Sequence, residues 1–141
     1  MKLGYTIIYV PQVSKTLLFF ETAFGLRRKF LHESGDYGEL NTGETTLAFA
    51  SHEFGRANLP KGYVAASDSL LPLGVEIAFT TSDVHSAFDS ALAAGAKGIK
   101  EPELKPWGQT IAYVRCPDGT LVELCTPMVG EPWQVLADSL R

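Results

Sequence analysis

The chain contains 141 residues, a length that suits one domain with a substantial hydrophobic core. Hydrophobic residues make up 45% of it and charged residues 20%, which is typical of a soluble globular protein. The formal net charge of -4 argues against a nucleic-acid-binding protein, which needs a basic stripe on its surface.

No apolar run reaches the roughly 18 residues that a membrane-spanning helix needs. The N-terminal segment also lacks the order of basic, apolar and small residues found in a signal peptide. We therefore expect no membrane or nucleic-acid partner, and a cytoplasmic location. The two cysteines, Cys116 and Cys125, fall at opposite ends of a predicted hairpin, so both are expected to be free thiols.

The first half of the chain predicts a strand, a helix and three more strands. Residues 3–10 are β-branched and aromatic on both faces, which predicts a strand that is buried on both sides. Pro11 ends this strand, and Gly25 ends the helix that follows. The apolar stripe of the helix consists of Val13, Leu17, Phe20 and Phe24. Three shorter strands are predicted at 27–33, 37–41 and 45–51.

Residues 52–72 break this pattern, because small, polar, glycine and proline residues predominate there. They predict a surface connection between the two halves of the chain. The length of this segment is compatible with a lid over a cleft and equally with a plain linker, and the sequence leaves both open.

The second half predicts the same order of elements. A strand at 73–80 precedes a helix that begins at Ser82 or Asp83 and ends at Gly95, with Val84, Phe88 and Leu92 as its apolar stripe. A short strand at 97–100 and a loop at 101–108 come next. A hairpin over 109–125 turns at Pro117, Asp118 and Gly119, and the second strand of this hairpin places Leu121, Glu123 and Cys125 on one face.

The two halves also align as an internal repeat. Residues 5–13 match 76–84, Gly25 matches Gly95, and Ala48 matches Glu123. Repeats of this length indicate two half-folds that share one core. After the repeat, the tail at 126–141 carries an apolar helical pattern made of Trp133, Val135, Leu136 and Leu140, and its role is left open.

At this point the chain resembles the vicinal-oxygen-chelate superfamily, which includes glyoxalase I, extradiol dioxygenases and bleomycin-resistance proteins. The resemblance covers residues 1 to about 126. Its most specific segment is Arg-Cys-Pro-Asp-Gly-Thr-Leu-Val-Glu-Leu at 115–124, preceded by Pro-Trp-Gly at 106–108. It implies an α+β fold in which two βαβββ modules, at 1–51 and 73–126, form cup-shaped mixed β-sheets. The connecting loop at 52–72 and the tail at 127–141 complete a single domain, and the cup is usually completed in a homodimer.

The resemblance also implies where a metal would bind. Metal-dependent members take four ligands from the first and last strands of each module, and these positions fall on Tyr5, Ala48, Glu76 and Glu123. Only Glu123 is the residue that the family uses. None of the three histidines, His32, His52 and His85, falls on a ligand position, and each is expected to be an ordinary polar residue.

Two carboxylates without nitrogen or sulfur donors suit Mg²⁺ or Mn²⁺ better than Zn²⁺ or Ni²⁺, and the site would be weak. The absence of the histidine ligands argues against glyoxalase I and extradiol dioxygenase activity. The expected cofactor is therefore none, or a weakly bound divalent metal ion.

A cup without metal is the alternative that the substitutions favour. Ala48 would open space, while Tyr5, Tyr9, Tyr113 and Trp107 would offer aromatic surface for a small, flat molecule that is polar or cationic. The tyrosines are equally compatible with packing in the core or at an interface. Trp107 is the better candidate for ligand contact because it lies on a loop.

The two carboxylates keep an enzymatic alternative open. If Glu76 and Glu123 face each other in a cup, both cannot ionise cheaply, so they would share a proton or bind a cation. One of them could then act as a general base in a divalent-metal-dependent lyase or isomerase. A third possibility is that Arg115 or Lys105 neutralises one of them. Whether this chain is an enzyme is left open.

Overall fold

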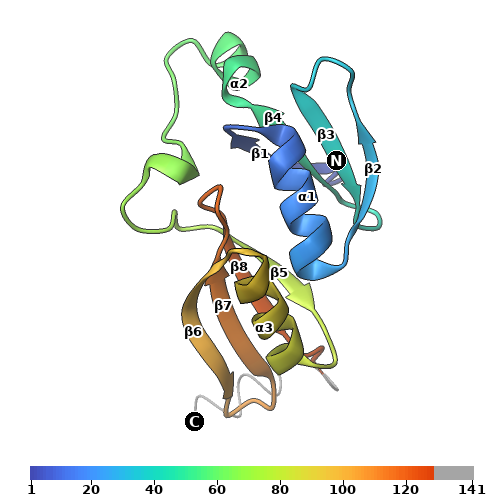
Figure 1. The fold of residues 1–141 in the computed structure, drawn as a ribbon, viewed down its shortest axis with the longest axis vertical. Coiled ribbons are helices and arrows are strands. Elements are labelled where there is room, and N and C mark those ends of the chain that lie inside the picture. Colours follow the sequence, from blue (N-terminus) through green and yellow to red (C-terminus); the bar gives the residue numbers. More distant parts are fainter. Residues whose placement is uncertain (129–141) are drawn as a thin grey trace.

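The computed structural model describes residues 1–128 and shows one βαβββ unit twice, joined by a linker (Figure 1). The first unit contains β1 (Tyr5–Val10), α1 (Val13–Phe24), β2 (Arg27–Leu31), β3 (Tyr37–Asn41) and β4 (Thr46–Ser51). The second contains β5 (Glu76–Thr80), α3 (Val84–Ala94), β6 (Lys97–Leu104), β7 (Thr110–Arg115) and β8 (Leu121–Cys125). The linker holds α2 (His52–Asn58) and a 3-10 helix, η1 (Ala66–Asp68). The predicted α+β fold class is confirmed.

Each unit forms a four-stranded mixed sheet, with the strand orders β1-β4-β3-β2 and β5-β8-β7-β6. The first and last strands of each unit are parallel neighbours, and the other neighbours are antiparallel. The strand register confirms the predicted alignment of the halves. Ile7 pairs with Ala48 in the first sheet, and Ala78 pairs with Glu123 in the second.

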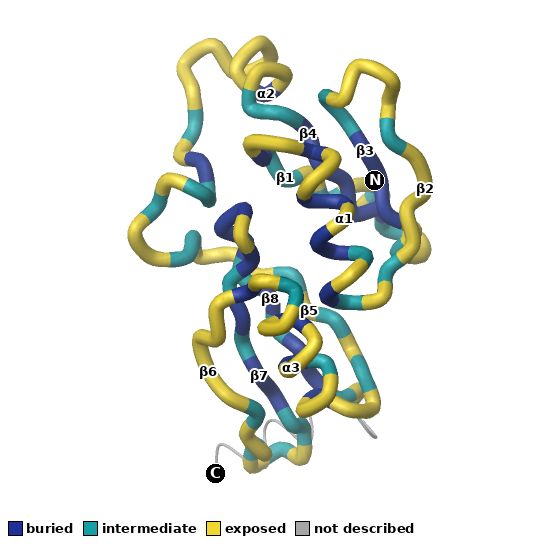
Figure 2. Tube along the Cα trace, in the orientation of Figure 1, coloured by how far each residue is buried: buried dark blue, intermediate teal, exposed yellow. Residues whose placement is uncertain are grey.

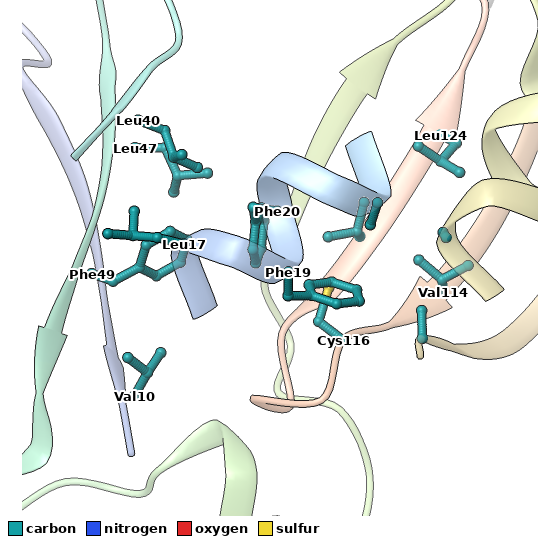
Figure 3. Packing of buried hydrophobic residues seen from close by; sticks show 14 of the residues in the cluster. Val10, Leu17, Phe19, Phe20, Leu40, Leu47, Phe49, Val114, Cys116 and Leu124 are labelled. Carbon is teal, nitrogen blue, oxygen red and sulfur yellow. The ribbon is translucent and has the colours of Figure 1, made fainter. Parts of the chain in front are cut away.

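The two units share one hydrophobic core, because α1 packs on the first sheet, α3 packs on the second, and the two helices pack against each other. Phe20 of α1 is fully buried, and its ring centroid lies 4.9 Å from that of Phe49 on β4 and 6.3 Å from that of Phe79 on β5. Figure 3 shows α1 between the sheets, with Leu17 toward the first unit and Phe19 toward the second. The apolar stripe of α1 therefore joins the units into one domain.

Each sheet turns its other face, called here the outer face, away from this core. In β1, Ile8 and Val10 pack against the core, whereas Tyr5 and Ile7 on the outer face are 58% and 45% exposed. The prediction that strand 3–10 is buried on both sides is therefore wrong for this chain. Figure 2 shows buried residues along β4, β7 and β8, and exposed ones along β2, β6 and much of the linker.

The linker and β6 contain more regular structure than the sequence predicts. Helix α2 begins directly after Ser51, whose Oγ accepts a hydrogen bond from the Phe54 N–H. Strand β6 continues to Leu104, so the predicted loop at 101–108 begins later than expected. Pro102 fits within β6 because this is an edge strand and its pairing with β7 shifts between Lys100 and Glu103.

Within residues 1–128, no helix is long and apolar enough to cross a membrane. Cys116 and Cys125 are buried free thiols, as predicted. The apolar pattern predicted for the tail, from Trp133 to Leu140, lies outside the described residues.

Candidate functional site

A pocket of about 290 Å³ lies where the two units and the linker meet. Its walls come from β1, the linker, β5 and the start of β8, and they are mostly apolar. Ile7 and Tyr9 line it from the first unit, and Tyr63 lines it from the linker. Among the described residues, Glu76 is the only charged side chain in the lining. The pocket therefore combines aromatic and aliphatic walls with a single carboxylate.

Strand alternation explains why Glu76 and Glu123 share a face. Ile77 of β5 packs against the core, and Val122 and Leu124 of β8 are buried in it. Glu76, which precedes Ile77, and Glu123, which lies between Val122 and Leu124, therefore point to the outer face of the second sheet, where β5 and β8 are neighbours. Glu76 and Glu123 consequently lie close enough that their charges interact.

The electrostatics of this face favour a cation. Burial and the neighbouring Glu123 raise the pKa of Glu76. The Tyr113 hydroxyl donates a hydrogen bond of 3.1 Å to Glu123 Oε1, and burial together with that carboxylate raises the pKa of Tyr113 to about 12. Burial, followed by Glu123 and Glu76, also raises the pKa of Cys125. A positive group bound here would relieve the repulsion between the carboxylates.

The possibility that Arg115 or Lys105 neutralises one of these carboxylates is wrong for the described residues, because both side chains have other partners. Lys105 pairs with Glu103 at 3.0 Å. Arg115 donates instead to carbonyl oxygens: those of Gly119 (3.2 Å), Ala66 (2.9 Å), Ser69 (2.8 Å) and Leu70 (3.1 Å). Arg115 thereby fastens the linker to the β7–β8 hairpin.

The outer face of the first sheet carries a carboxylate that the sequence analysis missed. Glu39 of β3 pairs in register with Ala48 and is only 6% exposed. Its Oε1 accepts a hydrogen bond of 3.0 Å from Tyr37, and its Oε2 lies 3.6 Å from the Lys29 Nζ. Burial and Glu39 raise the pKa of Tyr37 to about 12. The sequence signal was an acidic residue at the centre of a short strand, as at Glu123.

Of the predicted site residues, the pocket includes Glu76 and Tyr9. Those outside its lining are Tyr5, Ala48, Trp107, Tyr113 and Glu123. Trp107 lies in the β6–β7 turn, where its Nε1–H donates to Gln109 Oε1 at 2.8 Å. Gln109 in turn donates to the carbonyl of Thr126 at 2.8 Å. These bonds give Trp107 a part in fixing the turn, and its contact with a ligand stays a prediction.

The linker side of the pocket depends on Tyr63, His52 and Gly55, to which the sequence analysis assigned no role in a site. The rings of Tyr9 and Tyr63 lie 4.8 Å apart, and the Tyr63 hydroxyl is 2.7 Å from His52 Nδ1. A Cβ on Gly55 would lie 2.8 Å from both tyrosines, so only glycine lets α2 approach them. No local pattern could have revealed this cluster, because it forms where the linker folds back on β1.

The metal positions implied by the family resemblance divide between the two sheets. Tyr5 and Ala48 belong to one outer face and the two glutamates to the other, so each face supplies at most two carboxylates at these positions. Within residues 1–128, no three His, Cys, Asp or Glu side chains gather in a group that could hold a metal ion. The donor set of the described residues does not fit the metal centre of the metal-dependent members.

Comparison with known proteins identifies the family. The model of the Glyoxalase/Bleomycin resistance protein/Dioxygenase superfamily matches residues 2–124. A glyoxalase-related enzyme from Fulvimarina pelagi has a similar structure, with a TM-score of 0.76, 16% identity and coverage of 90% of this chain and 88% of that one. A glyoxalase/bleomycin resistance protein/dioxygenase family enzyme from Burkholderia phytofirmans PsJN gives a TM-score of 0.73, 20% identity and coverage of 89% and 98%. The uncharacterized protein YraH of Bacillus subtilis (strain 168) is 28% identical over 130 residues, which are 88% of this chain and 97% of YraH. The chain therefore belongs to the Glyoxalase/Bleomycin resistance protein/Dioxygenase superfamily.

Proposed function

We propose that this protein binds a small, flat, positively charged molecule in the pocket between its two units. The observation that carries this proposal is the placement of Glu76 in a largely apolar pocket that also presents Tyr9 and Tyr63. Aromatic rings attract a cation through their faces, and a carboxylate in the same pocket fixes its orientation. The volume of about 290 Å³ suits a ligand with one or two rings.

The charge of the ligand follows from the state of Glu76. Glu76 is exposed in the free chain, yet partial desolvation and Glu123 raise the pKa of this carboxyl, so its negative charge is held at a cost. A bound cation offsets that cost, whereas a neutral ligand of the same shape does not. We therefore expect affinity to rise with pH as Glu76 ionises.

The test uses naphthylmethylammonium and its neutral analogue naphthylmethanol, titrated into the full chain by isothermal calorimetry. We expect the cation to bind at least about tenfold more tightly, since hydrogen bonds to a charged group contribute about 1.5–3 kcal/mol. Glu76→Gln should remove this preference. Glu101→Gln, an exposed change on β6, is the matched control and should keep it. Equal binding of both probes to the unaltered protein would refute the proposed ligand class.

A divalent-metal-dependent lyase or isomerase that uses Glu76 and Glu123 is the second candidate. The interaction of these carboxylates on one outer face favours it, because a raised pKa suits Glu76 as a general base. The poor fit of the donor set argues for the binding role instead. Thermal melts of chelator-treated protein with Mg²⁺ or Mn²⁺ separate the two: an upward shift that Glu123→Gln abolishes would favour the metalloenzyme, and no shift would favour the binding protein.

We also propose that the protein is a homodimer in which a second copy covers the outer faces. The support is apolar exposure along this side: Leu3 is 68% exposed, Tyr5 58% and Val75 67%. Both β1 and β5 are edge strands, whose free side is available for pairing. Analytical ultracentrifugation should show a dimer that Leu3→Glu weakens, and a monomer at all concentrations would refute this assembly.

A further inference from the structure

The side chain of Tyr63 is one contact between β1 and the wall that the linker contributes to the pocket. The Tyr63 ring stacks on Tyr9 with a centroid distance of 4.8 Å, and its hydroxyl lies 2.7 Å from Nδ1 of His52, a residue outside the pocket lining. His52 is the first residue of α2, which Ser51 caps, so its position is fixed by the helix. The imidazole thus decides whether the Tyr63 hydroxyl has a partner.

The surroundings of His52 suit a neutral ring and not a charged one. Its Nε2 is buried and has no hydrogen-bond partner among the described residues. In the neutral ring, Nδ1 and the Tyr63 hydroxyl satisfy each other whichever of them donates. In the charged ring, Nε2 becomes a cationic N–H without an acceptor, which is costly to keep away from water.

We propose that His52 is a positioning residue and a pH-sensitive latch: its neutral imidazole holds Tyr63 on Tyr9, and its protonation releases residues 59–65 from β1. The release removes the Tyr63 wall of the pocket. The effect of this release on ligand affinity rests on the proposed function, whereas the release of residues 59–65 itself is a property of the free chain.

The charges around His52 support this direction. Burial of the ring and Arg56, one turn along α2, lower its pKa, while Asp68 on η1 opposes them with a smaller effect. From β1, the group that packs against the latch is the ring of Tyr9. From the linker it is Tyr63, whose hydroxyl is the partner of Nδ1. Among the described residues, the effect of Asp68 on the pKa of His52 is therefore too small to offset the effects of burial and Arg56.

The pH dependence follows from linkage. Once released, His52 titrates near its ordinary pKa of 6.5, whereas in the closed latch its pKa is lower. The open form therefore binds more protons between these two values, and the opening equilibrium rises as the pH falls through that window. The rise is at most about tenfold per pH unit for one titrating group. Above this window the latch stays closed.

Hydrogen exchange of the full chain without ligand tests the latch directly. Exchange of residues 59–65 is measured between about pH 5 and 8, the range where histidine titrates, and divided by the intrinsic rate at each pH. We expect the protection of this segment to fall with decreasing pH, while that of α1 stays constant. Constant protection of residues 59–65 across the range would overturn the proposal.

Three variants isolate the role of His52. Asparagine can place a polar atom near the position of Nδ1 without titrating, so His52→Asn should keep protection at high pH and lose its pH dependence. Tyr63→Phe should weaken protection even at high pH, because the hydroxyl partner is gone. His85→Asn changes an exposed histidine on α3 and should behave like the unaltered protein. A pH response that persists in His52→Asn would overturn the assignment.

Ligand binding separates this inference from the proposed function. In the presence of naphthylmethylammonium, the unaltered protein should lose affinity below the window and His52→Asn should lose less. If the exchange data show the latch and the probe does not bind, the latch holds and the ligand class is wrong. If the probe binds through Glu76 and exchange shows no pH response, the binding role holds and the latch is wrong.

Discussion

Gly119 provides a sharp test of how closely the linker lies against the second unit. Its φ is 95°, in the left-handed region that favours glycine, and a Cβ there would lie 2.2 Å from the Ala66 carbonyl oxygen and 2.7 Å from the Ser67 nitrogen. Gly43, between β3 and β4, has the same φ of 95°, but a Cβ on it would meet nothing within 4 Å. A residue with a side chain would therefore be equally strained in its backbone at both positions, but only at Gly119 would its Cβ collide with neighbouring atoms.

The expected magnitudes follow from that difference. An alanine at either position costs about 1–2 kcal/mol for the left-handed backbone. At Gly119 the neighbouring atoms are backbone and cannot move by changing rotamer, so overpacking adds about 1–3 kcal/mol. For a chain of 141 residues, each kcal/mol lowers the melting temperature by about 3–5 °C. Gly119→Ala should therefore melt clearly below Gly43→Ala.

Urea and thermal unfolding of both variants, compared with the unaltered chain, give the two free energies of unfolding. Hydrogen exchange then shows where Gly119→Ala acts. We expect faster exchange in residues 63–70 for this variant alone, because the linker must move off the turn. Equal destabilisation by the two variants, with unchanged exchange in the linker, would refute the close approach of Ala66 to the turn.

Three further changes test other parts of the structure. Arg115→Lys offers fewer donors to the linker carbonyls, so we expect the free energy of unfolding in urea to fall by about 1–3 kcal/mol and hydrogen exchange in residues 66–70 to become faster. Unchanged exchange would mean that Arg115 does not fasten the linker to the β7–β8 hairpin. Glu76→Gln should raise the melting temperature at neutral pH and match the unaltered protein below about pH 4.5, because a raised carboxyl pKa gives stability that is present in acid and lost as pH rises through it. A difference in melting temperature between the two proteins that increases in acid would contradict this expectation. Asp83→Ala removes the acceptor for the Ser86 N–H at 3.0 Å and should cost about 1 kcal/mol in thermal unfolding, whereas no change would mean that water replaces this cap.

Much of the fold could be predicted because its signals are local and occur twice. Helix α1 begins at Val13 and α3 at Val84, and Gly25 and Gly95 end them as predicted. The order of strand, helix and three strands follows from hydrophobic periodicity and turn residues in each half. Repetition then strengthens each assignment, because one half supports the other.

The incorrect predictions for α2, β6 and β1 have physical causes that cannot be read from a local sequence pattern. Helix α2 was not predicted because it contains Gly55, and glycine disfavours a helix. The presence of this glycine is explained only by the close packing of Tyr9 and Tyr63 against it. Pro102 falls in the predicted loop at 101–108, yet it lies within β6, an edge strand that tolerates proline. The outer side of β1 looked buried because its residues are apolar, but this chain leaves Tyr5 and Ile7 uncovered.

The candidate site divides in the same way. Alternation along β8 predicted that Leu121, Glu123 and Cys125 share a face, but it left open which face that is; in the structure Glu123 lies opposite the core, on the same side as Glu76 of the neighbouring strand β5. The pocket could not be predicted, since it depends on where the linker returns to β1 and on the Arg115 contacts that fasten it. Long-range contacts of this kind leave no periodic signal.

The division between repeat and linker bears on how specificity arises in this chain. The repeated units supply strands, the shared core and the carboxylates, all of which are constrained by sheet packing. The linker supplies Tyr63 and the backbone near Ala66, and it connects β4 of the first sheet to β5 of the second while lying beside β1 at the pocket. Its residues can change without disturbing either sheet, as surface connections generally can. The linker is therefore the part of the pocket wall that can vary most freely, and substitutions at Tyr63 should alter ligand choice more than stability.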